Sequence, residues 1–286
     1  MPETPMSEIA PSAPVVGFIG LGSQGGPMAG RIIAAGYPVG LWARRPEALE
    51  PFVEQGAEAM PSLEALGRAC GHVGVCVVDD RGVEEVCAAL IPVMRPGARI
   101  AIHSTIHPDT CVALAETASA HGVMLIDAPV SGGGPGAAAG TLTVMVGGET
   151  EAVEAARPIF QTFASLIVHL GGVGAGQNAK LVNNALMAAH MALAHQALAA
   201  GSALGIDRKA LIELIKASSG RSFGFEIYAR QPEPSAFAHG AALLAKDVRL
   251  LGEVLGADPS FAVLQGVAQP FLDLVRQGPA ATPPGA

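Results

Sequence analysis

Residues 15–25 read VVGFIGLGSQG, a short apolar run that leads directly into a glycine-rich turn, and a helical pattern follows over residues 27–35. A G-x-G-x-x-G turn placed between a strand and a helix predicts a dinucleotide-binding βαβ unit. In such a unit Gly20 permits the tight turn, Gly22 lets the backbone approach a pyrophosphate, and Gly25 lets helix and strand pack closely. The helix N-terminus adds free N–H groups and a positive dipole end. We therefore expect the cofactor phosphates to bind at Gly20, Leu21, Gly22, Ser23, Gln24 and Gly25.

Strand and helix patterns alternate over the following 150 residues or so. Further strands are expected at residues 37–43, 73–78, 99–102 and 123–126, with helical stretches such as 83–90 and 108–120 between them. This alternation predicts a parallel sheet with helices on both faces. Residues 141–146 and 166–168 are expected to extend the sheet.

The pattern changes after Gly176, where no convincing strand interrupts the helical stretches. We therefore predict an α/β protein, with an N-terminal Rossmann-type parallel-sheet domain followed by an all-α C-terminal domain. The expected parts are a disordered tail at 1–14, the nucleotide-binding domain at 15–174, and the helical domain at 175–286. A long interdomain helix is expected over about 176–204, and the chain is expected to be disordered from about 278.

The end of the second predicted strand bears on the choice of cofactor. NAD enzymes usually place an acidic residue there for the ribose 2′-hydroxyl. This chain has no acid between Gly36 and Pro46 and instead has Arg44 and Arg45. A guanidinium holds a 2′-phosphate through charge-assisted hydrogen bonds, which favours NADP, with NAD as the alternative. Two solvated arginines in a turn are the plainer interpretation.

Composition excludes several classes of function. The net charge of −8 argues against nucleic-acid binding, which needs clustered basic residues. The four cysteines have no C-x-x-C spacing and no histidine pair completes a zinc set, so we expect no metal and buried, reduced thiols. The apolar stretch at 179–204 contains lysine, asparagines and histidines, which argues against a membrane span. The N-terminal residues lack a signal-peptide pattern, so a cytoplasmic location is expected.

Three later motifs follow the glycine loop in a fixed order: DAPVSGG at 127–133, GTLTVMVGG at 140–148 and GAGQNAKLVNN at 174–184. A Lys-Asp pair follows at Lys246-Asp247. In these motifs the chain resembles the β-hydroxyacid dehydrogenases, which include the 3-hydroxyisobutyrate dehydrogenases. The resemblance covers nearly all of residues 15–275, and several motifs in one order are far more specific than any one of them.

The resemblance implies roles for particular residues. Ser131, Gly132 and Gly133 would bind the substrate carboxylate, in agreement with the anion affinity of exposed backbone N–H groups. Lys180 would be the catalytic acid/base, which requires burial or neighbours to lower its pKa. Asn184, four residues on and hence on the same helix face, would orient Lys180 or the substrate hydroxyl.

Two further residues would lie near the cofactor. The resemblance places Thr105 beside the nicotinamide, and Thr105 follows a strand at the carboxyl end where open α/β sheets bind ligands. It places Lys246 close to the cofactor and the active-site cleft, with a surface ion pair as the alternative. Gln24 departs from the methionine that the family commonly carries before the third glycine.

The expected activity is NADP-dependent interconversion of a small β-hydroxy acid and its oxo acid by hydride transfer. The alternatives are an NADPH-dependent imine or carbonyl reductase, a decarboxylating enzyme of the 6-phosphogluconate type, and a non-catalytic NADP-binding protein. Imine reductases generally lack a lysine at the place of Lys180. The long alanine-rich helix has more apolar surface around it than one subunit would cover, which predicts a homodimer or homotetramer.

Overall fold

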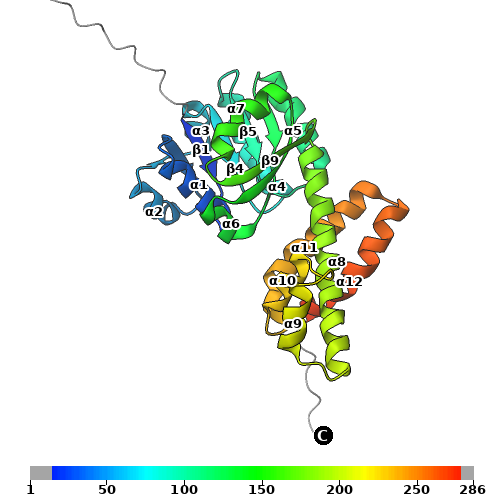
Figure 1. Ribbon diagram of the computed structural model, residues 1–286. Coiled ribbons are helices and arrows are strands. Elements are labelled where there is room, and N and C mark those ends of the chain that lie inside the picture. The colour runs from blue at the N-terminus through cyan, green and yellow to red at the C-terminus, as the bar shows by residue number, and fades with distance from the viewer. Residues whose placement is uncertain (1–14, 278–286) are drawn as a thin grey trace, which may run out of the picture. The chain divides into compact units, whose positions relative to one another are not determined.

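The computed structural model describes residues 15–277, and the chain divides into two compact units between Gln177 and Asn178 (Figure 1). The two expected disordered tails, 1–14 and from about 278, lie outside the described residues. None of the helices in residues 15–277 is both long enough and apolar enough to cross a membrane.

The first unit is built on one sheet, whose strands follow the order β3-β2-β1-β4-β5-β6-β8-β7, with β9 beside β8. In this spatial order, the six strands β3, β2, β1, β4, β5 and β6 are all parallel to their neighbours. Their bounds are β1 (Val16–Ile19), β2 (Val39–Trp42), β3 (Glu58–Ala59), β4 (His72–Val75), β5 (Arg99–Ile102), β6 (Met124–Asp127), β7 (Val130–Ser131), β8 (Leu142–Gly147) and β9 (Ala164–Gly171). The parallel part and its strand order confirm the predicted Rossmann-type domain.

The far edge of the sheet differs from the expectation of a purely parallel sheet. Strand β8 runs antiparallel to both β6 and β7, while β9 runs parallel to β8. Only ten residues separate the end of β7 from the start of β8, and helix α6 (Gly133–Ala139) occupies most of them. Parallel neighbours need a crossover of a dozen or more residues, so this short connection leads to an antiparallel pair. The sheet is therefore mixed at this edge.

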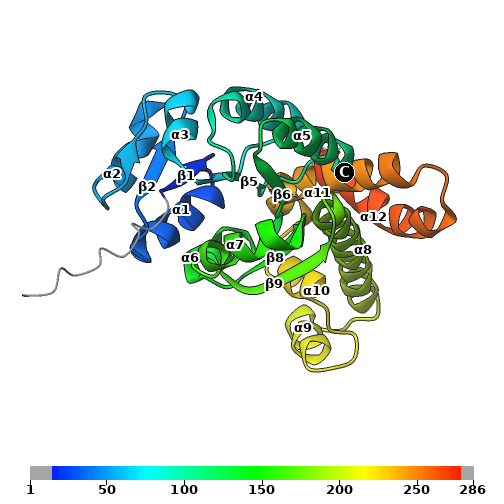
Figure 2. The same ribbon diagram turned by 90° about the horizontal axis from the view of Figure 1, so that it is seen from above.

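Helices cover both faces of the sheet (Figure 2). α1 (Gly25–Ala34), α6 and α7 (Thr150–Phe160) lie on one side, and α3 (Leu63–Ala69), α4 (Asp80–Leu90) and α5 (Pro108–Ala120) lie on the other. Alternate residues of a strand point to opposite faces. Phe18 of β1 accordingly joins the core under α1 and α7, whereas its neighbour Ile19 joins the core under α3, α4 and α5.

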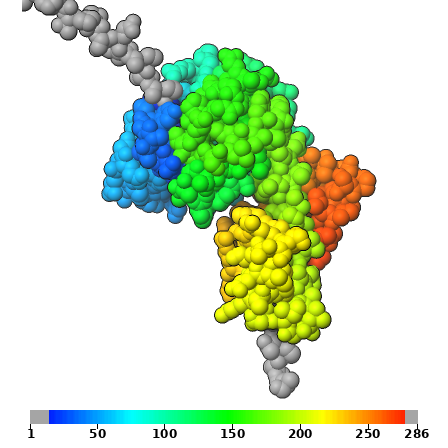
Figure 3. All heavy atoms as spheres, viewed as in Figure 1, coloured from blue at the N-terminus to red at the C-terminus, as the bar shows by residue number. Residues whose placement is uncertain are grey.

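Shorter elements complete the first unit. A 3-10 turn (Pro46–Leu49) and α2 (Glu50–Val53) follow β2, and a second 3-10 turn (Ile91–Val93) follows α4. In the space-filling view the green segment that holds α6, β8, α7 and β9 forms most of the visible face of this unit (Figure 3).

The second unit is helical in its described residues. Its helices are α8 (Ala175–Ala203, beginning in the first unit), α9 (Arg208–Lys216), α10 (Phe223–Ala229), α11 (Ala238–Leu255) and α12 (Pro259–Gln277), with a 3-10 turn at Pro234–Phe237. Successive turns of α8 and α11, together with α12, bury aliphatic and aromatic side chains in one core. α9 has no fully buried residue, and the yellow segment that contains it lies at the surface of this unit (Figure 3).

Helix α11 begins at Ala238, so Lys246 and Asp247 lie near its middle. α10 was not predicted as a helix, because its pattern covers only seven residues next to Ser and Gly. Within it Phe225 belongs to the core, whereas Phe223 is 64% exposed.

Candidate active site

The glycine loop has the geometry that a phosphate cradle needs. Gly20 has φ +93°, and a Cβ there would lie 2.1 Å from the carbonyl oxygen of Cys76. A Cβ at Gly25 would lie 1.9 Å from the carbonyl oxygen of Gly20, so neither position accepts a side chain. At Gly22, by contrast, no atom lies within 4 Å of the Cβ position. Gly22 therefore leaves open the space that a pyrophosphate would occupy.

The N-terminus of the helix that follows the loop has the features of an anion-binding site. Gln24 is the N-cap residue of α1, its side chain makes no capping hydrogen bond, and the first turn of α1 contains no acidic residue. Backbone N–H groups at such a helix N-terminus attract phosphate. The loop and the helix together fit a dinucleotide cofactor.

A cleft of about 370 Å³ continues from the glycine loop along the carboxyl ends of β1, β2 and β4. Gly20, Leu21 and Gly22 line one part of it, and Arg44 and Arg45 line another together with Trp42 and Ala43. Glu85 of α4 also borders the cleft and is ion-paired with Arg81. Both predicted arginines thus lie in the same cleft as the predicted phosphate loop.

A second glycine loop follows β7 and contains the predicted carboxylate site. Gly132 and Gly133 have φ of +130° and +64°, a backbone conformation that favours glycine, and Ser131 is partly exposed. Gly134 was not predicted as part of the site. A Cβ at Gly134 would lie 2.6 Å from the carbonyl oxygen of Ser23, so the two glycine loops are in backbone contact. The run of three consecutive glycines was the available signal.

The turn after β5 contains Thr105, which is partly exposed between buried Ser104 and Ile106. Nearby, the buried carboxylate of Asp127 accepts hydrogen bonds from the backbone N–H groups of Gly174 and Gln177, both at 2.7 Å. Burial raises the pKa of Asp127, while these N–H groups oppose that rise. Asp127 thereby caps the N-terminus of α8 from a distant strand. Asp127 belongs to the DAPVSGG motif, which gives no local signal for this contact.

The histidines after β5 do not form a metal site. His103 is buried, its ring stacks on Phe18, and its Nδ1 lies 2.8 Å from the carbonyl oxygen of Ala128. Burial lowers the pKa of His103 to about 4. Residues 15–277 contain no group of three His, Cys, Asp or Glu side chains arranged to hold a metal ion.

Lys180 lies in the second turn of α8 and is only 8% exposed. Burial lowers the pKa of its ammonium group from 10.5 to about 8; the nearby carboxylate of Asp247 raises it, and Lys246 lowers it further. Burial disfavours the charged form of an amine, so a larger share of Lys180 is neutral at moderate pH. An amine in this state can exchange a proton with a substrate.

Asn184 lies one turn beyond Lys180 and is held by an acidic residue of α11. Its Nδ2 donates a hydrogen bond of 2.6 Å to Oδ2 of Asp247, which is 3% exposed. The other carboxylate oxygen of Asp247, Oδ1, lies 3.5 Å from Nζ of Lys246, and this distance is long for a hydrogen bond. Oδ1 has no hydrogen-bond partner among the described residues. Burial raises the pKa of Asp247, and Lys246, Asn184 and Lys180 oppose that rise. The sequence gives no local signal for this role of Asp247, because Asn184 and Asp247 are 63 residues apart.

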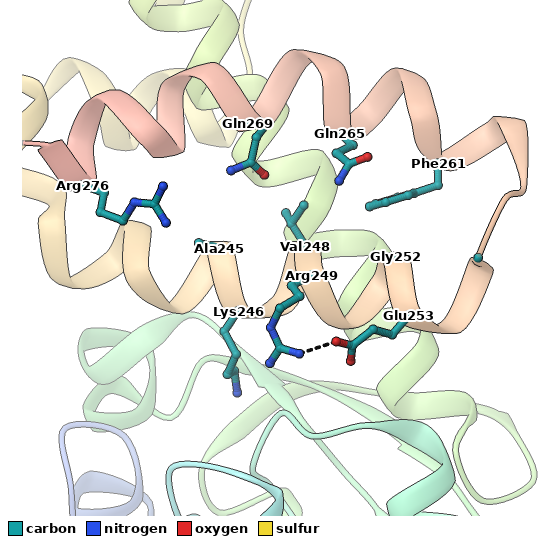
Figure 4. Close-up of a pocket in the computed structure, with 11 residues that line it drawn as sticks. Ala245, Lys246, Val248, Arg249, Gly252, Glu253, Phe261, Gln265, Gln269 and Arg276 are labelled. Atoms are coloured by element: carbon teal, nitrogen blue, oxygen red, sulfur yellow. Dashed lines mark hydrogen bonds and ion pairs between the residues drawn. The ribbon is translucent and has the colours of Figure 1, made fainter.

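Lys246 also borders a groove of about 630 Å³ between α11 and α12 (Figure 4). Phe261, Gln265 and Gln269 extend from α12 toward α11, while Lys246 and Arg249 leave α11 on the other side (Figure 4). Arg249 is ion-paired with Glu253. Lys246 is the one predicted site residue that borders this groove.

The predicted site residues thus fall into two groups. The first unit brings together the glycine loop, the two arginines and the glycines of the predicted carboxylate site, with Thr105 at the end of a neighbouring strand. The second unit brings together Lys180, Asn184 and Lys246 around Asp247. One group suits a dinucleotide and an anion, and the other suits proton exchange.

Comparison with known proteins finds nicotinamide-cofactor-binding families and dehydrogenases. Residues 15–171 match the NAD-binding domain of 6-phosphogluconate dehydrogenase, and residues 174–281 match the NAD-binding domain of NADP-dependent 3-hydroxyisobutyrate dehydrogenase. An NAD-dependent L-serine dehydrogenase of Pseudomonas aeruginosa is 36% identical over 92% of this chain and 93% of its own length. A 3-hydroxyisobutyrate dehydrogenase of the same organism is 37% identical over 84% of this chain and 83% of its own.

Among solved structures, a Mycobacterium tuberculosis 3-hydroxyisobutyrate dehydrogenase with L-serine has a TM-score of 0.81 and 26% identity, covering 94% of this chain and all of that one. The family matches and the relatives together span both units. The chain therefore belongs to the β-hydroxyacid dehydrogenase family of NAD(P)-dependent oxidoreductases, which act on the CH–OH group of hydroxy acids.

Proposed function

We propose that this protein is an NADP-dependent dehydrogenase that interconverts a small β-hydroxy acid and the corresponding oxo acid, with Lys180 as the acid/base. The observation that carries the proposal is the buried Lys180, whose pKa is lowered to about 8. A surface lysine near 10.5 would be almost entirely charged at neutral pH and unable to accept a proton.

The cofactor would be held by the first unit. Backbone N–H groups around Gly22 and the N-terminus of α1 would bind the pyrophosphate, and Thr105 would lie beside the nicotinamide. Arg44 and Arg45 support NADP, because a guanidinium pairs well with a 2′-phosphate. NAD remains the alternative, since the relative that acts on L-serine is named as NAD-dependent.

The substrate carboxylate would bind at Ser131, Gly132 and Gly133. The positive φ values there turn the backbone so that the loop can present N–H groups to an anion, and Ser131 adds a hydroxyl donor. L-serine and 3-hydroxyisobutyrate, which name two relatives, are both short acids with the hydroxyl on the carbon next to the α-carbon. This shared pattern supports a small β-hydroxy acid as the substrate class.

In the oxidative direction neutral Lys180 would accept the proton of the substrate hydroxyl. Asn184, held by Asp247, would orient that hydroxyl or the amine. The nicotinamide supplies the hydride acceptor when the cofactor is bound. In reduction the ammonium of Lys180 would return the proton to the forming alkoxide, so one residue acts as base and as acid.

The first test is cofactor absorbance with NADP and then NAD against a panel of short β-hydroxy acids. Lys180→Ala is the test variant, and Lys209→Ala, at an exposed position of α9, is the matched control. Turnover that favours NADP, collapses in Lys180→Ala and survives in Lys209→Ala would support the proposal. Equal turnover in both variants would remove Lys180 from the mechanism.

The same assay separates the alternatives. Tight NADPH binding without hydroxy-acid turnover would favour an imine or carbonyl substrate, tested next in the reductive direction. Binding without any turnover would favour a non-catalytic NADP-binding protein.

We also propose that the protein is a homodimer or homotetramer. Val182, Leu186 and Leu193 of α8 are four and seven residues apart, hence on one side of the helix, and each is at least 45% exposed. Exposed aliphatic side chains gathered along a helix favour association. Light scattering at micromolar concentration should give a multiple of 28.8 kDa, and a monomeric mass would overturn this proposal.

A further inference from the structure

We propose that Gln177 is a positioning residue for the nicotinamide end of the cofactor site, because its side chain holds the turn that carries Thr105. This inference rests on the proposed function in one respect, namely that Thr105 lies beside the nicotinamide. Gln177 is not among the residues that the sequence analysis assigned to the site.

The side chain of Gln177 bridges the two neighbours of Thr105. Its Oε1 accepts a hydrogen bond of 3.2 Å from the backbone N–H of Ile106, and its Nε2 donates one of 2.8 Å to the carbonyl oxygen of Ser104. Only one orientation of the amide satisfies both partners, because the flipped group would place oxygen against oxygen. The amide therefore holds Thr105 from both sides.

Gln177 is itself held firmly. It is completely buried, and its backbone N–H donates a hydrogen bond of 2.7 Å to Asp127 at the end of β6. A further hydrogen bond holds the same turn, since the hydroxyl of Ser104 accepts one of 2.8 Å from the backbone N–H of Val77. Two buried hydrogen bonds from a fixed side chain give the Thr105 turn a single position.

This position matters for the cofactor because of where the turn lies. The turn follows β5, at the carboxyl end of the parallel sheet, where open α/β sheets bind their ligands. Val77, which donates to Ser104, lines the cleft that starts at the glycine loop. A shift of the Ser104–Ile106 turn would therefore move groups at the cofactor end of the sheet.

The test is a double-mutant cycle on the affinity of the full-length protein for NADPH, measured by fluorescence titration without substrate. Gln177→Met removes both hydrogen bonds while keeping the length of the side chain, and Thr105→Val removes the hydroxyl from the turn. We expect Gln177→Met to raise the Kd by about tenfold, because a turn released from these hydrogen bonds must be ordered again when NADPH binds. If Gln177 acts through the turn, Thr105→Val adds less than about twofold once Gln177 has been replaced.

The matched control is Val153→Ala, a buried substitution in α7. It destabilises the same unit by leaving a cavity. We expect its Kd for NADPH to stay within about twofold of wild type, whereas a merely structural role for Gln177 predicts similar Kd values for Val153→Ala and Gln177→Met. If Gln177→Met does not fold, Gln177→Glu takes its place, because it keeps the shape and the acceptor for Ile106.

The outcomes separate the two proposals. A coupled cycle in a protein that turns over no hydroxy acid would refute the proposed function and leave this inference standing. Additive effects on the Kd, or an unchanged Kd in Gln177→Met, would overturn the inference even if hydroxy acids are oxidised.

Discussion

The lowered pKa of Lys180 predicts the pH dependence of the reaction. At pH 7 an amine with a pKa of about 8 is neutral in about one molecule in eleven, whereas an amine at 10.5 is neutral in about one in three thousand. Burial therefore makes the neutral form about 300 times more abundant at that pH. For oxidation of a hydroxy acid, kcat/KM should rise with pH and level off above a midpoint near 8.

Two substitutions in α11 should move this midpoint in opposite directions. Asp247 favours the ammonium form of Lys180, so Asp247→Asn should shift the midpoint to lower pH. Lys246 disfavours the ammonium form, so Lys246→Met should shift it to higher pH. Asn at position 247 can still accept the hydrogen bond from Asn184, which keeps the packing and isolates the effect of charge.

The assay is initial-rate oxidation from pH 6 to 10, with reduced-cofactor absorbance as the signal and thermal denaturation as a check on folding. We expect shifts of at least about half a pH unit, since charged neighbours commonly move a buried group by this much or more. Shifts of the same sign in both variants, or a wild-type profile without a midpoint near 8, would refute the assignment of Lys180 as the titrating base.

Three further predictions concern the first unit. Arg44→Ala should lower kcat/KM for NADP by about tenfold to a hundredfold and leave that for NAD nearly unchanged; an unchanged preference would remove Arg44 from the 2′-phosphate site. Gly22→Ala should keep the melting temperature, because its Cβ meets no protein atom, yet raise the Kd for NADPH at least about tenfold by filling the space for the pyrophosphate. Gly25→Ala should lower the melting temperature, because its Cβ would meet the carbonyl oxygen of Gly20. Equal melting temperatures for the two variants would contradict this. Burial lowers the pKa of His72 to about 3 and of His103 to about 4, so below pH 6.5 the unfolded chain binds protons that the folded chain does not. Stability followed by the single tryptophan in urea should fall by up to about 2.7 kcal/mol per pH unit between pH 6 and 4, and a flat profile would argue against two neutral buried rings.

Local periodicity and turn chemistry made most elements of the fold predictable. The strand Arg99–Ile102 and the helix Pro108–Ala120 match the predicted ranges residue for residue. Side-chain alternation and helical spacing depend on residues close together in the chain, so they can be read without knowing what packs against them. The glycine loop is predictable for the same reason, because its strand, turn and helix are consecutive.

Contacts between distant segments were not predictable in this way. The antiparallel β8 depends on how the chain returns after β6, and the bond from Asn184 to Asp247 joins residues 63 apart. Predicting either feature requires knowing which distant segments lie side by side. A local sequence pattern does not contain that information.

The sequence by itself determined the order of strands and helices, the position of the glycine loop and, through motif order, the resemblance to the β-hydroxyacid dehydrogenases. Only the tertiary structure decided the pKa of Lys180, the hydrogen bond from Asn184 to Asp247 and the hydrogen bonds that hold the turn around Thr105. A lysine has the same intrinsic pKa in any sequence, and the shift to about 8 comes from burial and from charges brought near by folding. Identity of the reactive groups is thus a property of the chain, whereas their reactivity is a property of its packing.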